Sequence, residues 1–391
     1  MILKLKHYSK YCLISIVFFS VFQSEAVFAL KEPIIRVLIL KNNNIRIRAD
    51  KTIPLTIKGE NFSNKKIKGL TLKNENNRII LYFDKDKQKI YDLESNQQFQ
   101  INTSDERGIW VGQKRFSGKL NLYVLESEIL VVNVIGIEKY LSSVVGSEMP
   151  TKWPIEALKA QAIASRTYAL KQKGNDLFDI DSTQKNQVYN GLESRTHKTT
   201  KAVRSTRSLV LIHDNKLINA LFHSSSGGMT ENSQDVWKNK YPYLSSVKDF
   251  DHNNPKFSWQ KNFSSKELAS LFPSIGGLEN IEILNLTSTG RVKNVRLFGA
   301  EGSYQMSGVD LRKRLGLNSN LMRFRFFEEE TNNEFPSETK GLIVFGQGSG
   351  HGVGMSQWGA KYMASKGYKA EIILKHFYTG VEIKPFSENY L

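Results

Sequence analysis

The stretch that decides the fold is residues 140–173, YLSSVVGSEMPTKWPIEALKAQAIASRTYALKQK. Its second half predicts a helix from Pro154 to about Lys173, because proline suits the first turn of a helix and Gly174 suits its end. Many alanines allow this helix to pack closely against its neighbours. Apolar or small side chains recur on one face at helical spacing, at Ile155, Leu158, Ala162, Ser165 and Ala169.

Glu148 stands just before this helix, between an apolar run and the dipeptide Met149-Pro150. Proline disfavours helical backbone at the residue before it, so we expect the carboxylate to project from an extended turn. Apolar neighbours such as Val145 and Trp153 would raise the pKa of this carboxyl by desolvation, as a general acid requires. The alternative is an ordinary solvated glutamate.

The rest of the chain alternates short strands with polar turns. Residues 30–115 carry candidate strands and no evident chemistry, which predicts a β-rich N-terminal module. We predict an α+β fold with two lobes, in which a mixed region over residues 116–385, with the alanine-rich helix, follows the β-rich module. The expected later elements are hairpins over 120–134, 209–222 and 281–298, a strand at 342–345, and helices near 266–272, 356–366 and 369–377.

The run GQGSGHGVG at residues 346–354 places a glycine at every second position. Such a run favours close approach of the backbone to a ligand or to another segment. It does not match a phosphate-binding Walker A loop, a dinucleotide-binding fingerprint or a nucleophile elbow. It therefore predicts a loop that presents His351 and Gln357, and the alternative is a tight structural corner with a satisfied histidine.

The N-terminus is typical of a secretory signal peptide over residues 1–29. Lys4, Lys6 and Lys10 precede an apolar stretch at 12–22, and small residues then lead to Ala29. An uncleaved anchor is the alternative, with peripheral or anchored membrane association. We expect an exported protein of the periplasm, the cell wall or the extracellular space.

Composition narrows the class of protein. The chain has 391 residues, a net charge of +17 and 40% hydrophobic residues, so it is neither disordered nor collagen-like, and it lacks the apolar runs of a multi-span membrane protein. Cys12 is the one cysteine, so a chain cleaved after Ala29 has no disulfide and no cysteine nucleophile. A basic exported protein is attracted to anionic polymers. Because no nucleic-acid-binding motif stands out, cell-wall polymer is a better candidate ligand than nucleic acid.

Four motifs, in order, resemble the SpoIID/LytB family over roughly residues 115–385. The motifs are the stretch 140–170, Gln187-Val-Tyr-Asn-Gly191, the segment HSSSGGMTE at 223–231 with the following Trp237 and Tyr243-Leu244, and GHGVGMSQWGA at 350–360.

The resemblance implies a peptidoglycan lytic transglycosylase that acts on glycan strands stripped of stem peptides. It makes residues 116–385 the catalytic region, with the alanine-rich helix beside an active-site groove between the two lobes. It places the catalytic acid/base at Glu148 and implies that Arg166 binds a substrate carboxylate or carbonyl. It further implies hydrogen bonds to sugar hydroxyls, with Tyr168 or Tyr189 as a stacking face. The residues expected to make those hydrogen bonds are Gln187, Tyr189, His351 and Gln357. Structural roles, such as a helix-surface arginine, stay open for all of these binding residues.

Two departures from the family bear on cofactors. Some relatives hold zinc between the alanine-rich helix and the Gln-x-Tyr motif, but residues 171–186 contain neither histidine nor cysteine here. We therefore expect no metal and no cofactor. Asn186 also stands where some relatives carry histidine, which leaves Glu148 without a second acid at that point.

The resemblance leaves two main functions open. The first is the lytic transglycosylase, whose substrate is peptidoglycan glycan strands. The second is a non-catalytic wall-binding protein that stimulates a cell-wall amidase, an N-acetylmuramoyl-L-alanine amidase, and that enzyme is then the candidate partner. A sugar-binding module without turnover is a third, weaker reading.

Overall fold

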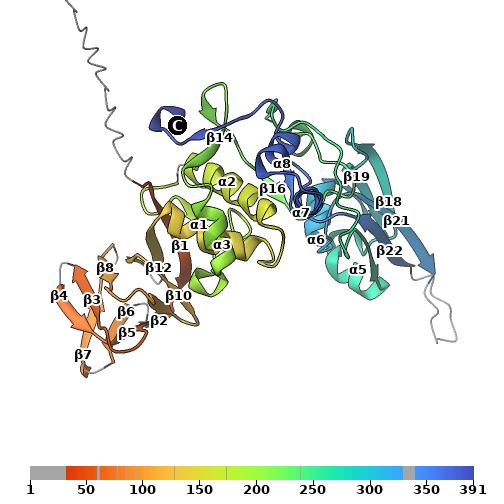
Figure 1. Cartoon of the computed structure of the whole chain (residues 1–391). Helices are drawn as coiled ribbons and strands as arrows, with labels where there is room; N and C mark the ends of the chain where they lie inside the picture. Colours follow the sequence, from red (N-terminus) through yellow and green to blue (C-terminus); the bar gives the residue numbers. More distant parts are fainter. Residues whose placement is uncertain are drawn as a thin grey trace, which may run out of the picture. The chain divides into compact units, whose positions relative to one another are not determined.

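The chain folds as a strand-rich α+β protein. The structure is a computed structural model that describes residues 32–391, except 60–61, 77, 85, 95, 127, 173, 238 and 329–339. The predicted signal peptide at residues 1–29 lies outside the described residues. Residues 33–391 form one compact unit, and Figure 1 shows the course of the chain.

Two large sheets hold most of the N-terminal half. The first has the order β13-β1-β12-β11-β8-β3-β4, with bounds Ile180–Asp181, Ile34–Asn42, Glu128–Gly136, Lys119–Leu125, Gln98–Asn102, Leu55–Gly59 and Phe62–Ile67. The second has the order β10-β9-β2-β5-β6-β7, with bounds Lys114–Phe116, Ile109–Val111, Asn44–Ala49, Gly69–Glu75, Arg78–Phe83 and Asp86–Leu93. The first sheet contains strands from both sides of position 115, so the β-rich N-terminal part shares its sheet with later strands.

Four smaller sheets follow. Their bounds are β15 Lys216–Leu217, β14 Leu209–His213 and β24 Glu382–Pro385; β16 Phe222–His223 and β23 Met355–Ser356; β17 Ser258–Phe263, β22 Lys340–Gln347 and β21 Met322–Glu328; and β18 Asn280–Leu286, β19 Val292–Gly299 and β20 Gly302–Ser307.

The described residues form eight α-helices and three short 3₁₀ helices. The α-helices are α1 Ile137–Glu148, α2 Ile155–Lys171, α3 His197–Arg204, α4 Ser233–Val236, α5 Ser265–Leu271, α6 Gly308–Arg314, α7 Gln357–Ser365 and α8 Ala370–Phe377. The 3₁₀ helices are Gly191–Ser194, Pro273–Ile275 and Glu388–Tyr390.

The predicted long helix is confirmed as α2, and it is buried on nearly every side rather than on one face. Alanine dominates its sequence, so α1, α3, α7, α8 and β14 can all pack closely around it. Figure 1 shows α1, α2 and α3 beside one another. This central position explains why four polar residues of α2 are buried as well, namely Gln161, Ser165, Arg166 and Thr167.

The segment before α2 differs from the expectation. Residues 137–148 form helix α1, and Glu148 is its last residue rather than part of an extended turn. Met149 has the extended backbone expected of a residue before proline, with φ −126° and ψ 142°. Pro150 therefore ends the helix immediately after Glu148.

Two of the three predicted hairpins are confirmed, and the third is broken. β11 pairs with β12 and β18 pairs with β19, both antiparallel. In the third, β14 pairs with β15 at only two positions, while Phe222–His223 leaves that sheet to pair in parallel with Met355–Ser356. This exchange of partners brings the segment at 223 against the glycine run.

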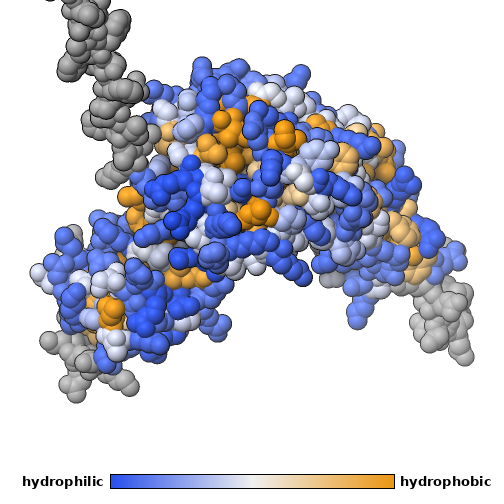
Figure 2. Space-filling model, viewed as in Figure 1, coloured by the Kyte–Doolittle hydropathy of each residue, from blue (hydrophilic) through white to orange (hydrophobic). Residues whose placement is uncertain are grey.

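The apolar side chains form two main clusters. One joins the N-terminal sheets to α1, α2 and α8, and the other joins β17, β19 and β22 to α5 and α6. The face drawn in Figure 2 is mostly hydrophilic, with hydrophobic residues in small patches. Among the described residues, none of the helices has the length and apolar character needed to cross a bilayer.

Candidate active site

A pocket of about 560 Å³ collects residues from segments that lie far apart in the sequence. Glu148 comes from the end of α1, Tyr168 from α2 and Arg312 from α6. The remaining lining residues are Ser147, Gln184, Lys185, Asn186, Val188, Leu221, Phe222, His223, Ser224, Trp237, Ser349, Gly350, His351 and Gln357. Among the described residues of this lining, Glu148 is the one acidic side chain.

Glu148 is held in a largely desolvated position. Its Oε1 accepts a hydrogen bond of 2.6 Å from the backbone N–H of Val188, and the Gln357 side chain donates a second one. Burial raises the pKa of Glu148 to about 7, because the two hydrogen bonds offset only part of the cost of desolvating the charge. The carboxyl can therefore hold a proton near neutral pH and also release it.

Gln357 and His351 reach the pocket as predicted. Gln357 begins α7, is 8% exposed, and contacts Gln161 of α2 as well as Glu148. His351 stacks edge-on against Trp237, with 5.3 Å between the ring centroids. The structure thus brings Glu148, His351 and Gln357 to one pocket.

Two histidines lie side by side in the pocket wall. The rings of His223 and His351 are 5.5 Å apart. Burial, with Arg312 and Arg291 nearby, lowers the pKa of His351 to about 4 and keeps that of His223 well below its usual value. Both rings are therefore neutral at pH 7, and neither one can act as a cationic acid there.

The glycine run fits against the segment that carries His223. A side chain at Gly350 would meet Cβ of His223 at 2.7 Å, and one at Gly354 would meet the carbonyl of Leu221 at 2.1 Å. Both glycines have positive φ, 110° and 74°. The close approach predicted from the glycines is therefore to another segment of the same chain, and it sets the two histidines next to each other.

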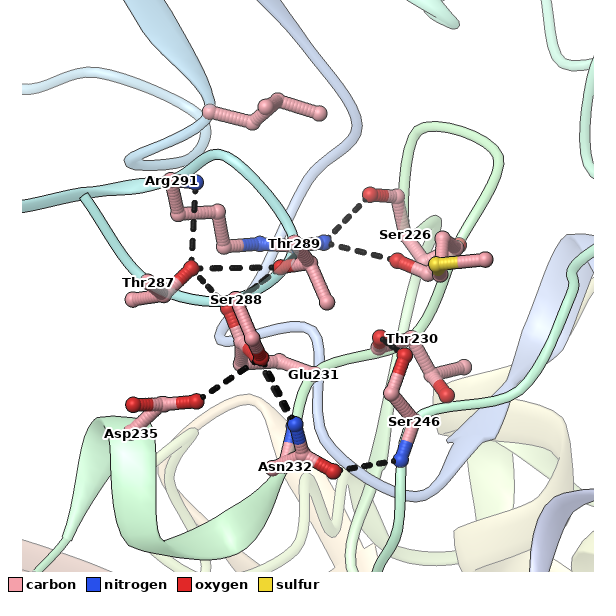
Figure 3. A network of polar contacts seen from close by, with 12 residues as sticks. Ser226, Thr230, Glu231, Asn232, Asp235, Ser246, Thr287, Ser288, Thr289 and Arg291 are labelled. Atoms are coloured by element: carbon pink, nitrogen blue, oxygen red, sulfur yellow. Dashed lines mark hydrogen bonds and ion pairs between the residues drawn. The ribbon is translucent and has the colours of Figure 1, made fainter.

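A buried polar network holds the segment that follows His223 (Figure 3). Glu231 accepts 2.5 Å hydrogen bonds from the hydroxyls of Thr287 and Thr289, and its carboxylate lies 3.7 Å from the guanidinium of Arg291. Arg291 donates to the carbonyl oxygens of Ser226 and Met229. The network ties the segment at 226–231 to the start of β19 and so fixes the pocket wall.

Arg166 does not reach the pocket. It is fully buried, and its guanidinium makes two hydrogen bonds to Glu138, of 2.9 and 2.7 Å, and one to the carbonyl of Leu209. The central burial of α2 leaves this side chain no path to solvent. Arg166, which the resemblance assigns to a substrate carboxylate or carbonyl, therefore faces the interior of the fold and not the pocket.

Gln187 and Tyr189 also lie behind the pocket rather than in its lining. Gln187 donates to the carbonyl of Ser165 and accepts from Tyr140, and the Tyr189 hydroxyl donates to Asn133. These internal bonds hold the segment at 187–189 against α1 and α2. They thereby position the Val188 N–H that bonds Glu148.

Several pocket residues were not predicted as binding residues from the sequence. His223 and Trp237 lie in motifs that the sequence displays, so their motif membership was an available signal. Arg312 lies outside every motif, and nothing local in the sequence distinguishes it from other arginines. Tyr168 was foreseen as a stacking candidate and does line the pocket.

The segment between α2 and Gln187 carries hydrogen bonds between polar side chains. Asn186 donates to the Tyr168 hydroxyl over 3.1 Å and accepts from the N–H of Asp181. Among the described residues, no three His, Cys, Asp or Glu side chains gather in a way that could hold a metal ion.

Comparisons with known proteins identify relatives of this chain. The SpoIID family model, described as stage II sporulation protein, matches residues 125–213. Stage II sporulation protein D of Bacillus subtilis (strain 168) is 35% identical over 273 residues, which cover 64% of this chain and 75% of that protein.

Two further relatives extend the match. An uncharacterized protein of Brachyspira hyodysenteriae is 34% identical over 282 residues, covering 70% of this chain and 73% of that protein. The amidase enhancer of Bacillus subtilis is 29% identical over 296 residues, covering 63% of this chain and 40% of that protein. With these identities and the family-model match, the chain belongs to the SpoIID family.

Proposed function

We propose that this protein is an exported peptidoglycan lytic transglycosylase in which Glu148 is the single acid/base. The observation that carries the proposal is a lone carboxyl group in a concave pocket with a pKa of about 7. A general acid works best when its pKa lies near the working pH. A surface glutamate would be ionised there and could not donate the proton.

One carboxyl group suffices for the proposed reaction. Glu148 donates its proton to the glycosidic oxygen as the bond to the muramic acid C1 breaks through an oxocarbenium-like transition state. The C6 hydroxyl of the same sugar then attacks C1 and returns its proton to Glu148. The products are a 1,6-anhydro-muramic end and a new free hydroxyl, so no water is consumed. Hydrolysis, by contrast, would use a second carboxylate, about 5–9.5 Å away, as nucleophile or as base for a water.

The other pocket residues suit a sugar ligand. Trp237 is 41% exposed, which leaves ring surface for a pyranose. The neutral amide of Gln357 lines the pocket together with the acid and suits sugar hydroxyls. The His351 ring accepts from the N–H of Val353 and is hydrogen-bonded to the backbone of Phe222, so it offers the sugar its neutral ring face beside Trp237. We keep His351 and Gln357 as substrate-binding residues, and we assign Arg166, Gln187 and Tyr189 to holding the pocket wall in place.

Export and domain organisation complete the proposal. We infer that residues 1–29 are a signal peptide, whose removal leaves a net charge of +15 on the mature chain. A basic protein is attracted to anionic wall polymer. We retain residues 30–115 as the β-rich N-terminal module and residues 116–385 as the catalytic region, with the groove between two lobes.

The test is digestion of purified, peptide-free glycan strands by the mature protein, with mass spectrometry of the new ends. We expect anhydro-muramic ends from the wild type and a loss of about 10²–10⁴-fold in rate for Glu148→Gln. Glu371→Gln is the matched control, because Glu371 is an exposed residue of α8 paired with Lys375. Equal cutting by Glu148→Gln would refute the mechanism.

The amidase-enhancer relative favours a second candidate, a non-catalytic wall protein that stimulates a separate amidase. This function needs glycan binding but no proton transfer. Two results together would favour it. The wild type and Glu148→Gln would both bind strands without making new ends, and both would speed turnover by the amidase.

A further inference from the structure

Arg312 lines the pocket and has no acidic partner among the described residues. It lies on α6, where Leu311 and Leu315 are buried in the second apolar cluster and hold the helix in place. Its Nε donates to the carbonyl of Leu317 over 3.3 Å. Among the described residues no ion pair or further hydrogen bond engages its two terminal nitrogens, although the side chain is only partly exposed and lines the pocket with Glu148.

Two fully buried arginines, Arg166 and Arg291, show how unusual this is. Arg166 is paired with Glu138 and Arg291 with Glu231, and both also donate to backbone carbonyls. Removing a guanidinium from water is costly unless an anion or several acceptors replace the water. Arg312 is partly desolvated and, among the described residues, its side chain has one carbonyl as acceptor, so two terminal N–H groups remain available to bind an anion.

A second unpaired group lies in the same wall. His223 is 4% exposed, and its Nδ1 lies 3.1 Å from the carbonyl of Val353, so Nδ1 carries the proton. Its Nε2 is then an acceptor, and it has no hydrogen-bond partner among the described residues. A buried acceptor needs a donor. The pocket therefore fits a ligand that carries both an anionic group and a hydroxyl or amide N–H.

We propose that Arg312 binds the lactyl carboxylate of muramic acid and thereby makes the pocket selective for glycan strands without stem peptides. This inference rests on the proposed function, since it takes the glycan to be the ligand. When the stem peptide is removed, the lactyl group ends in a carboxylate that a guanidinium can bind through two parallel hydrogen bonds. When the peptide is attached, the same group is a neutral amide and offers only one oxygen.

The test measures binding in a Glu148→Gln background, where no strand is cut. Three ligands are compared: peptide-free strands, strands with stem peptides, and an N-acetylglucosamine oligomer of equal length that has no lactyl group. The variants are Arg312→Gln, Arg312→Lys and the control Lys313→Gln. Lys313 is exposed on the same helix, next to Arg312, so its variant loses the same charge.

We expect Arg312→Gln to weaken binding of peptide-free strands about 10- to 100-fold, the range of a charge-assisted hydrogen-bond pair. Binding of the N-acetylglucosamine oligomer should change by less than about threefold, as should binding of every ligand to Lys313→Gln. Arg312→Lys keeps the charge but cannot make two parallel hydrogen bonds, so its affinity for peptide-free strands should lie between those of Arg312 and Arg312→Gln. This variant also serves if Arg312→Gln does not fold.

Three results would overturn the inference. If Arg312→Gln lost equal affinity for peptide-free strands and for the N-acetylglucosamine oligomer, Arg312 would be a general sugar contact, while the proposed function would stand. A larger loss for peptide-bearing strands would assign Arg312 to a peptide carboxylate instead. Failure of the wild-type pocket to bind any glycan would refute both proposals. Strand binding without cutting by the wild type would refute only the catalytic function.

Discussion

The molecule places an acid and an arginine in each of two regions, a buried network and the pocket, and the two pairs differ in their contacts. In the network of Figure 3, Glu231 and Arg291 face each other, and hydroxyls and carbonyls bond most of their remaining atoms. In the pocket, Glu148 and Arg312 form no ion pair with each other, and each keeps bonding capacity that the protein does not use.

The difference separates structural from functional polar groups. A buried charge that is paired contributes to one fixed arrangement of the chain. A desolvated carboxyl without a cation changes its pKa instead, and a desolvated guanidinium without an anion keeps donors for a ligand. The network holds the pocket wall rigid, and the pocket keeps groups unpaired for chemistry.

The largest expected effect comes from breaking the network. Arg291→Met leaves the Glu231 carboxylate, which is 0% exposed, without its cation, and we expect a loss of about 3–5 kcal/mol in the free energy of unfolding. Arg312→Met should cost less than about 1 kcal/mol, since it removes one hydrogen bond to a carbonyl. Urea denaturation of both variants checks this. Similar losses for the two would erase the distinction between the regions.

A smaller change in the free energy of unfolding, this time a gain, is expected when glutamine replaces Glu148. Its pKa is about 7 in the folded protein against 4.5 for an ordinary glutamate, so the folded state binds more protons between these values. Stability then falls as the pH rises from 4.5 to 7, by at most about 3 kcal/mol, and stays low above pH 7. Glu148→Gln has no charge to bury. It should be more stable than the wild type at pH 8 and equal to it at pH 4.

Thermal denaturation of the wild type and Glu148→Gln across pH 4–8 measures the difference in stability between the two proteins. Glu371→Gln, on an exposed side chain, should show no such trend. A Glu148→Gln protein that is less stable at pH 8 would mean that the carboxylate is solvated or paired in the folded state.

The smallest effect concerns the pH dependence of cleavage. Because Glu148 must be protonated to start the reaction, kcat/KM should halve near pH 7 and fall about tenfold per unit above it. Gln357→Met removes a hydrogen bond that lowers the pKa of Glu148, so the fall in kcat/KM should begin at a higher pH in this variant. His351, with a pKa of about 4, should add no inflection above pH 5. A rate that rises up to pH 8 would instead make Glu148 a base in the slow step.

Much of the fold was predictable because its signals are local. Pro154 and the alanine-rich pattern gave α2 to within a few residues, and Pro150 fixed the extended backbone of Met149. The hairpin over 120–134 followed from two apolar stretches, 120–124 and 129–134, on either side of a polar turn. The break after Leu217 was not predictable, since Phe222–His223 takes its partner from residues 355–356, far along the chain.

The sequence by itself determined that Glu148 stands at the end of an apolar run, that prolines and glycines fix the chain around it, and that the chain carries the motifs of the SpoIID family. Only the tertiary structure decided which polar side chains face the pocket. Arg166 pairs with Glu138 inside the fold, while Arg312, which no motif marks, lines the pocket. The reason is physical: backbone preference depends on neighbours in sequence, but the burial and pairing of a charge depend on segments that meet only after folding.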